Sequence, residues 1–139
     1  MRYLGLDLGS RTLGIAVSDP TGMIASSYKT IRHEEEYDRL LEEVLSIISE
    51  LEIEAVVLGF PKNMNNTIGP KGELSLEFQK KLQERVSIPI ILQDERLTTK
   101  SATDLLIQGN VRRKDRKKVV DSVAATIILQ TYLDRRERE

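Results

Sequence analysis

The 139-residue chain contains no cysteine, no tryptophan and only one histidine. The absence of cysteine excludes a disulfide framework, a thiolate zinc site and a cysteine nucleophile. The single histidine, His33, argues against a histidine-based triad or zinc cluster, and we expect it to be an ordinary loop residue. Any bound metal would therefore depend mainly on carboxylate ligands, which favour hard ions such as Mg²⁺ or Mn²⁺.

Aromatic residues and long apolar runs are also scarce. Aromatic residues make up 4% of the chain, so extensive stacking on nucleic-acid bases is not the expected mode of binding. No apolar run reaches the ~18 residues of a membrane-spanning helix, and no signal peptide is expected at the N-terminus. With 40% hydrophobic and 31% charged residues, one globular domain is expected over residues 1–139.

Positive and negative charges are distributed unevenly along the chain. Residues 1–60 contain five Lys or Arg and eleven Asp or Glu, which gives a net charge of −6. Residues 61–139 contain sixteen Lys or Arg and eleven Asp or Glu, which gives a net charge of +5. We therefore expect a polarised surface, on which one face attracts a polyanion while carboxylates gather elsewhere.

The order of the predicted elements indicates an α/β fold. Alternating apolar residues and short turns predict an antiparallel meander of three strands, over residues 2–8, 13–19 and 23–31. Two short apolar runs predict later strands, over 54–60 and 88–93. Apolar residues at helical spacing predict four helices, over 35–51, 73–86, 98–108 and 117–135.

The helices between the later strands require those strands to run parallel, because the chain must cross back over the sheet. We therefore expect a ribonuclease-H-like fold: a five-stranded mixed sheet in which the three-strand meander is followed by two parallel strands. The first strand should be central, with helices on both faces. A flavodoxin-like sheet would need a helix between the first two strands, where only the turn "GSRT" stands.

Asp7 is a carboxylate within an otherwise apolar first strand. Aspartate is depleted in strands and is rarely buried without a partner. Gly5 and Gly9 on either side have no side chains, so a backbone, a metal ion or a phosphate could approach Asp7 closely. A functional site is one explanation, and the cap of a neighbouring helix or an ion pair with Arg11 is the alternative.

Asp94 and Glu95 follow the fifth predicted strand, and strand ends are where sites form in open α/β sheets. Because neighbouring residues on a strand point to opposite faces, only one of the two is expected to face Asp7. In the alternative explanation, one acid caps the helix predicted over 98–108 and the other pairs with Arg96.

Asp121 lies near the start of the last predicted helix, on the same face as Ala124 and Ala125. The alanines allow this face to pack closely against the sheet, although a solvated aspartate favoured by the helix dipole is the simpler explanation. Together with Asp7 and an acid after the fifth strand, Asp121 would complete a carboxylate cluster. Such a cluster can bind divalent ions and support hydrolysis of a phosphodiester.

A run of cations stands just before Asp121. Its members are Arg112, Arg113, Lys114, Arg116, Lys117 and Lys118. An isolated run of this kind is usually a solvated loop between helices. Beside a carboxylate cluster, we expect this basic run to bind the phosphate backbone of a nucleic acid.

With these residues identified, the chain resembles the YqgF family of Holliday-junction-resolvase-like proteins. The resemblance covers nearly the whole chain and is carried in order by "GLDLGSRTLGIAVSD", "VVLGFPKNMNNT", "DERLTT" and "RRKDRKKVVDSVAATIIL", followed by "YLD". It implies a metal-dependent nuclease of the bacterial cytoplasm that matures the 5′ end of the small-subunit ribosomal RNA precursor. It also implies Mg²⁺ or Mn²⁺ as the cofactor and structured RNA, rather than a membrane, as the partner.

The motifs of the family suggest which residues would act. The catalytic and metal-binding acids would be Asp7, Glu95 and Asp121, with Asp94 as the alternate to Glu95. Arg11 in the first turn and Arg96 after Glu95 would contact phosphate, together with the basic run.

The chain departs from the family pattern in two places after the fourth predicted strand. Related resolvases carry an acid at the end of that strand, where this chain reads "GFPKN", so the second ligand must come from the fifth strand. Asn65 and Asn66 stand where family members often have Asp-Gly. Asparagine can adopt the left-handed backbone geometry of such a turn, which then carries one less negative charge.

Three other functions are compatible with parts of the sequence. Actin-like ATPases and sugar kinases have a first phosphate loop that looks like "LDLGSRTLG", but they need two such domains, and this chain supplies one. A DNA junction resolvase would need a dimer to place two sites, and no dimer seam is visible in the sequence. A non-catalytic RNA- or ribosome-binding module would have the same fold without the activity.

Overall fold

The computed structural model describes residues 1–9, 11–61, 68–94 and 113–138, and the side chains of the last segment from Val123 to Arg136. Its elements follow one another as β1 (Tyr3–Leu8), β2 (Thr12–Ser18), β3 (Ala25–Arg32), α1 (Tyr37–Glu50), β4 (Ala55–Phe60), α2 (Pro70–Gln83), β5 (Ile90–Asp94) and α4 (Arg113–Arg138). Among these described helices, none is long and apolar enough to cross a membrane.

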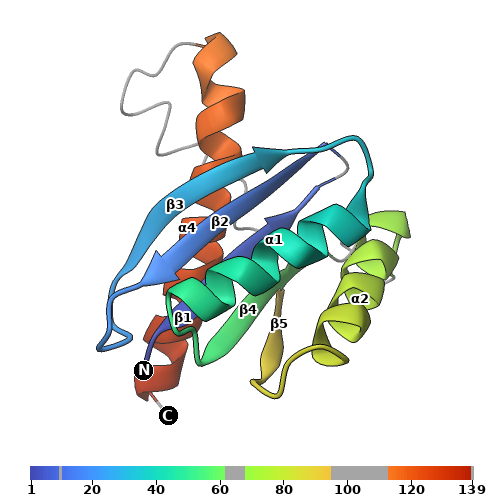
Figure 1. Ribbon diagram of the computed structural model, residues 1–139. Helices are drawn as coiled ribbons and strands as arrows, with labels where there is room; N and C mark the ends of the chain where they lie inside the picture. The colour runs from blue at the N-terminus through green and yellow to red at the C-terminus, as the bar shows by residue number, and fades with distance from the viewer. Residues whose placement is uncertain (10, 62–67, 95–112, 139) are drawn as a thin grey trace.

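The five strands form one mixed sheet in the order β3-β2-β1-β4-β5, with β1 at its centre (Figure 1). The pairs β1–β2 and β2–β3 are antiparallel, whereas β4 runs parallel to β1 and β5 runs parallel to β4. The predicted meander, the two parallel strands and the central first strand are therefore confirmed. A tight turn places β2 on one side of β1, and the crossover through α1 places β4 on the other side.

Helices cover both faces of the sheet, as predicted: α1 and α2 lie on one face and α4 on the other (Figure 1). The larger core lies beneath α1 and α2. There the alternate β1 residues Leu4, Leu6 and Leu8 belong to the same buried cluster as Leu40 of α1 and Phe78 of α2. This face of the sheet is filled by long aliphatic and aromatic side chains.

The core beneath α4 includes several alanines beside larger side chains. Its buried members come from three strands and from α4: Tyr3, Ala16, Ala55, Val57, Ala125, Ile128, Leu129 and Leu133. A Cβ atom added at Gly5 would lie only 2.8 Å from Cβ of Leu129 and 3.1 Å from the carbonyl oxygen of Ala125. The missing side chain at Gly5 therefore allows α4 to approach the central strand closely.

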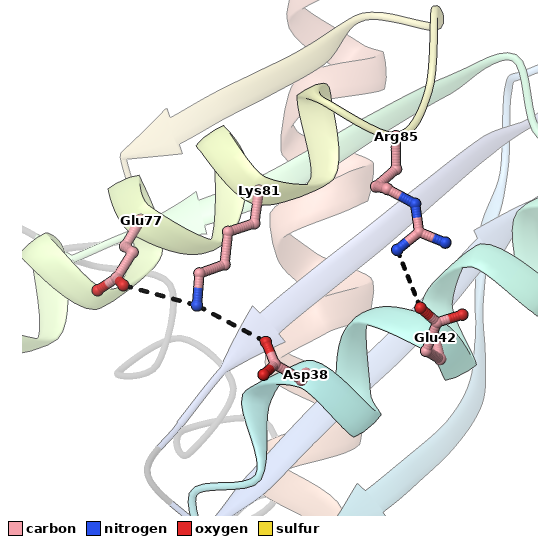
Figure 2. A network of polar contacts seen from close by, with 5 residues as sticks. All are labelled: Asp38, Glu42, Glu77, Lys81 and Arg85. Carbon is pink, nitrogen blue, oxygen red and sulfur yellow. Dashed lines mark hydrogen bonds and ion pairs between the residues drawn. The ribbon is translucent and has the colours of Figure 1, made fainter.

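Ion pairs on the surface join α1 to α2 above the larger core. Figure 2 shows Lys81 of α2 between two carboxylates, with its Nζ 3.7 Å from Asp38 of α1 and 3.7 Å from Glu77 of α2. Arg85 follows α2 and donates a hydrogen bond of 2.9 Å to Glu42 of α1. Because these side chains are largely exposed, the pairs contribute little stability compared with the core below them.

The helices differ from the predictions by a few residues at both ends, and α2 ends at Gln83 rather than at 86 and α4 at Arg138 rather than at 135. α2 begins at Pro70 rather than at 73, because proline fits the first turn, where the missing N–H would have no partner. α4 begins at Arg113 rather than at 117, so most of the basic run is helical and is not a loop. Lys and Arg favour helix, and no Gly or Pro interrupts residues 111–138. The helix predicted over 98–108 lies outside the described residues.

Asp19 closes the turn between β2 and β3. The backbone N–H groups of Met23 and Ile24 each donate to the Asp19 carboxylate at 2.9 Å, and the Thr21 hydroxyl also donates to it. These hydrogen bonds, with that from Ile24 first, hold the pKa of Asp19 well below its usual range. The role of this aspartate is therefore to stabilise the turn.

Candidate active site at the carboxyl ends of the central strands

Asp7 is a half-buried residue near the carboxyl end of β1. It pairs in register with Gly14 of β2, and it alternates with Leu6 and Leu8, which belong to the core beneath α1 and α2. Successive side chains of a strand point to opposite faces, so Asp7 lies on the face covered by α4, like Gly5. The predicted position of Asp7 within the central strand is confirmed.

The register of the sheet places two other residues in the same row as Asp7. β1 pairs with β4 through Leu6 and Leu58, and continuing this register by one residue places Asp7 beside Gly59. Gly59 in turn pairs with Gln93 of β5. The row Asp7–Gly59–Gln93 thus crosses three adjacent strands near their carboxyl ends, which is where sites form in open α/β sheets.

Asp94, the last residue of β5, lies on the other face of the strand. Ile90 and Leu92 contact the core beneath α1 and α2, whereas Ile91 contacts the core beneath α4. The same alternation places Asp94 with Ile90 and Leu92, and Gln93 with Ile91. Asp94 therefore does not share the face of Asp7. Glu95 and Arg96 lie outside the described residues.

α4 runs antiparallel to β1 across this face of the sheet. Near the start of β1, the ring of Tyr3 lies against the ring of Tyr132, with 5.9 Å between their centroids. Two residues further along β1, Gly5 lies against Leu129 and Ala125, earlier in the helix. Moving along β1 toward Asp7 therefore corresponds to moving toward the N-terminal part of α4.

The backbone of α4 at position 121 is one turn before Ala125. A four-residue step along a helix advances about 6 Å, and the two-residue step from Gly5 to Asp7 advances about 6.6 Å along a strand. Because Gly5 lies against both Leu129 and Ala125, these matching steps place Asp7 near the helix turn over residues 121–125. The side chain of Asp121 lies outside the described part of the chain.

The turn after β1 carries Arg11 and is held by His33. The backbone N–H of Gly9 donates to the carbonyl of Thr12 at 2.8 Å, and the backbone N–H of His33 donates to the carbonyl of Arg11 at 3.0 Å. Arg11 itself is exposed, and none of the ion pairs between described residues joins it to Asp7. The turn therefore leaves the Arg11 side chain on the surface beside the end of β1.

His33 is a loop residue, as expected from the sequence, but it is buried, with 5% of its surface exposed. Its Nε2 lies 3.0 Å from the carbonyl oxygen of Gly9, and its Nδ1 accepts a hydrogen bond of 3.0 Å from the backbone N–H of Glu35. Since a carbonyl can only accept, both contacts are satisfied when the proton is on Nε2. His33 thus links the turn after β1 to the start of α1, a role that no sequence pattern indicated.

The predicted basic residues are only partly within the described structure. Five of them occupy the first turns of α4, which begins at Arg113: Arg113, Lys114, Arg116, Lys117 and Lys118. Their side chains and the whole of Arg112 lie outside the described residues. The helical backbone nevertheless places these positions just before position 121, on the element that approaches the row Asp7–Gly59–Gln93.

The described residues contain no group of three His, Cys, Asp or Glu side chains that could hold a metal ion. Of the predicted metal-binding acids, the described residues include the side chains of Asp7, on the α4 face, and Asp94, on the opposite face. A carboxylate on a central strand suits a hard divalent ion as one ligand of several. The fit of this site to a metal therefore rests on Asp7 together with acids at positions 95 and 121.

Sequence relatives match almost the full length of the chain. The family model described as "RuvX: Holliday junction resolvase" matches residues 1–135. A relative from Geobacillus sp. (strain WCH70) is 50% identical over 138 residues, which cover 99% of this chain and 100% of the relative. A relative from Bacillus subtilis (strain 168) is 50% identical over 135 residues, which cover 96% and 98%. Both relatives are named "Putative pre-16S rRNA nuclease".

Solved structures of resolvases share the fold. RuvC of Thermus thermophilus superposes with a TM-score of 0.61 at 17% identity, covering 99% of this chain and 97% of RuvC. That RuvC has also been solved in complex with its Holliday junction substrate. The Holliday junction resolvase of fowlpox virus gives a TM-score of 0.62 at 15% identity, covering 97% and 99%. The predicted ribonuclease-H-like fold is therefore confirmed.

Proposed function

The chain belongs to the RuvX family of Holliday junction resolvases, and we propose that it is a metal-dependent nuclease that processes the 5′ end of pre-16S ribosomal RNA. The observation that carries this proposal is the position of Asp7 on the central strand, on the face covered by α4, near the helix turn over 121–125 and the carboxyl ends of β4 and β5. The two relatives named for pre-16S rRNA, each 50% identical over nearly the whole chain, support the choice of substrate.

The acids that would act are Asp7, Glu95 and Asp121, within one nuclease domain over residues 1–139. Glu95 is preferred to Asp94 because Asp94 lies on the face of β5 opposite to Asp7. Mg²⁺ or Mn²⁺ bound by these carboxylates would supply an activated water and stabilise the leaving oxygen of the phosphodiester. The role of Asp7 is to provide a fixed ligand, since the paired strands on both sides hold its backbone in place.

Cationic residues on both sides of this row would hold the substrate. Arg11 lies on the turn directly after β1, and the basic run of α4 precedes position 121. We expect these residues, with Arg96 and Arg112, to contact phosphates of a structured RNA, because phosphate contacts fix the register of a nucleic acid without reading its sequence. A ribosomal precursor would be met in the cytoplasm.

The test is cleavage of a pre-16S RNA fragment by the wild type and by Asp7→Asn, with Mg²⁺ or Mn²⁺ and with EDTA. Asp7→Asn preserves shape but removes a charged ligand, so we expect the cleavage rate to fall by about 100-fold or more. Asp38→Asn is the matched control, because the Asp38 side chain is 93% exposed on α1, on the other side of the sheet. Equal cleavage by the wild type and Asp7→Asn would contradict the proposed site.

A second candidate function is resolution of Holliday junctions, which the matching family model favours by its description. The same variants should therefore be assayed on a four-way DNA junction. Faster cleavage of the junction than of the RNA would favour this second function. Tight RNA binding by wild type that cleaves neither substrate in either metal would instead indicate a non-catalytic RNA-binding module.

A further inference from the structure

The outer edge of the sheet is formed by β3, and the charged residues of this strand are all cationic. β3 is the last strand in the order β3-β2-β1-β4-β5, so it pairs with β2 on one side and with no described strand on the other. Its two charged residues, Lys29 and Arg32, are exposed. Neither of them forms an ion pair with a described residue. These cations are therefore available to a negatively charged partner.

Tyr28 stands beside Lys29 on this edge, and 40% of its surface is exposed. The other aromatic residues of the described chain are buried or half-buried. Tyr28 lies at a β-bulge, because Ile15 of β2 pairs with Lys29 and the next residue of β2 pairs with Ser27, which leaves Tyr28 without an opposite residue. Bulges redirect side chains. The Nζ of Lys29 lies 5.9 Å from the centroid of the Tyr28 ring, so an aromatic face and a cation stand together at the surface.

This edge is poorly suited to pairing with another strand. Bulges and lysines are features by which natural edge strands avoid such pairing, and β3 has both, at Tyr28 and Lys29. A second copy paired along β3 would also bring the like charges of two such strands together, which is unfavourable. An exposed ring beside unpaired cations instead fits a single-stranded nucleic acid, whose bases stack on aromatic side chains and whose phosphates attract cations.

The β3 edge adjoins the candidate site. Asp7 pairs with Gly14 of β2, and Gly14 pairs with Thr30 of β3, so Thr30 lies in the row of Asp7, about 10 Å away by the spacing of strands. Arg32 lies two residues further along β3, opposite the residue that follows Arg11. α4 packs against β3, and its N-terminal end, which carries the basic run, projects beyond this edge of the sheet (Figure 1). Cationic positions thus continue from the site to the edge.

We propose that Tyr28, Lys29 and Arg32 bind a single-stranded segment of the RNA whose cleaved phosphodiester lies at Asp7. This inference rests on the proposed function and adds a binding surface outside the carboxylate site. One base stacks on the ring of Tyr28, while Lys29 and Arg32 contact phosphates of the same segment. Every base has a face that can stack, so this contact favours single strands without reading their sequence.

The experiment measures binding without cleavage, by fluorescence anisotropy in EDTA. The probe is a labelled pre-16S RNA hairpin with a single-stranded flank, used alone and with the flank annealed to a complementary strand. Tyr28→Leu should raise Kd by about 10-fold for the single-stranded flank and leave Kd unchanged for the annealed one, in which the bases are already paired. Tyr28→Phe retains the ring and should bind as the wild type does.

Lys29→Gln tests the phosphate contact separately, and it keeps the test valid if Tyr28→Leu folds poorly. Removing one contact to a single strand should reduce the slope of log K against log salt by about 0.7. Lys80→Gln is the matched control for charge, because Lys80 is exposed on α2 and forms no ion pair with a described residue. Ile24→Ala is the control for exposed apolar surface, because Ile24 is 64% exposed next to β3 and has no ring. Both controls should bind RNA as the wild type does.

Three results would overturn the inference. The first is wild-type binding by both Tyr28→Leu and Lys29→Gln, and the second is an equal loss in either control or with the annealed flank. The third is a wild-type dimer that Tyr28→Glu converts to monomers in sedimentation, which would assign the edge to a second copy of the chain.

Failure of this inference is distinct from failure of the proposed function. Unchanged RNA binding by the β3 variants, with cleavage still lost in Asp7→Asn, overturns only the role of the β3 edge. A wild-type protein that neither binds nor cleaves the RNA overturns both.

Discussion

The two faces of the sheet differ in what their side chains do. The face beneath α1 and α2 is filled by large aliphatic and aromatic residues, such as Leu58 and Phe78, and ion pairs join its two helices at the surface. The face beneath α4 has glycine or alanine at several contact positions, among them Gly5 and Ala125. The polar residues of the candidate site, Asp7 and Gln93, both lie on this second face.

This difference suggests that the first face contributes mainly to stability and the second face mainly to function. Burial of large apolar side chains is the main source of folding free energy, so most of it should come from the first face. Small residues on the second face bring the backbone of α4 near the central strand, which places the helix turn over 121–125 near Asp7. Substitutions on the two faces should therefore affect stability and cleavage differently.

The largest loss of stability is expected for Phe78→Ala on the first face. Phe78 is 2% exposed in the larger core, and truncation of a buried phenylalanine to alanine typically costs about 3–5 kcal/mol. Urea unfolding measures this loss, and cleavage per folded molecule should stay near that of the wild type. Phe78→Leu is the milder control. A selective loss of cleavage in the folded fraction would mean that the two faces are not independent.

A smaller loss of stability, with a larger loss of cleavage, is expected for Gly5→Ala on the second face. The added Cβ would lie 2.8 Å from Cβ of Leu129, so α4 must move away from β1. Overpacking of this kind typically costs about 1–3 kcal/mol, and the shift would carry position 121 away from Asp7. Cleavage should therefore fall more than in Phe78→Ala when both are compared as fully folded protein. Unchanged cleavage in Gly5→Ala would show that close packing of α4 is not needed for the site.

The sequence predicted the first face and the sheet more completely than the second face. Apolar periodicity and turn lengths specify the strand order, because a turn as short as "GSRT" permits only an antiparallel neighbour. Asp7 was also identifiable, since a carboxylate in an apolar strand contradicts the local pattern. The start of the last helix was predicted four residues too late, at 117 rather than at Arg113, because charge alone does not distinguish a connector from the first turn of a helix such as α4.

Two residues near the site carried no usable signal in the sequence. His33 lies in a polar stretch of the sequence, and its hydrogen bond to the carbonyl of Gly9 joins it to a residue 24 positions away. Gln93 stands between an apolar run and two acids, and only the register of β4 with β5 places it in the row of Asp7. Contacts between distant segments decide both cases, and periodicity within one segment does not contain that information.

His33→Ala should lower both stability and cleavage, each to an intermediate degree. The variant leaves the carbonyl of Gly9 and the N–H of Glu35 without their buried partner, which should cost about 1–3 kcal/mol. Cleavage should also fall, because the turn that carries Arg11 loses one of its supports. His33→Gln can still donate to Gly9 and should recover part of both losses, as measured by urea unfolding and by kcat and KM. Full cleavage in His33→Ala would show that Arg11 does not need this support.

The smallest effect is expected for the ion pairs of the first face, through Lys81→Gln. Lys81 lies 3.7 Å from both Asp38 and Glu77, but these carboxylates are largely exposed, so water and salt screen the attraction. We expect a loss of about 0.2–1 kcal/mol that shrinks when urea unfolding is repeated at high salt, with cleavage unchanged. Lys80→Gln is the matched control, because Lys80 adjoins Lys81 on α2 and forms no ion pair with a described residue. If Lys81→Gln cost as much as Phe78→Ala, the stability of the first face would depend on its surface charges as much as on its core. That outcome would contradict our assignment of the stability of the first face to apolar burial, because its surface charges would then contribute as much to folding as its core does.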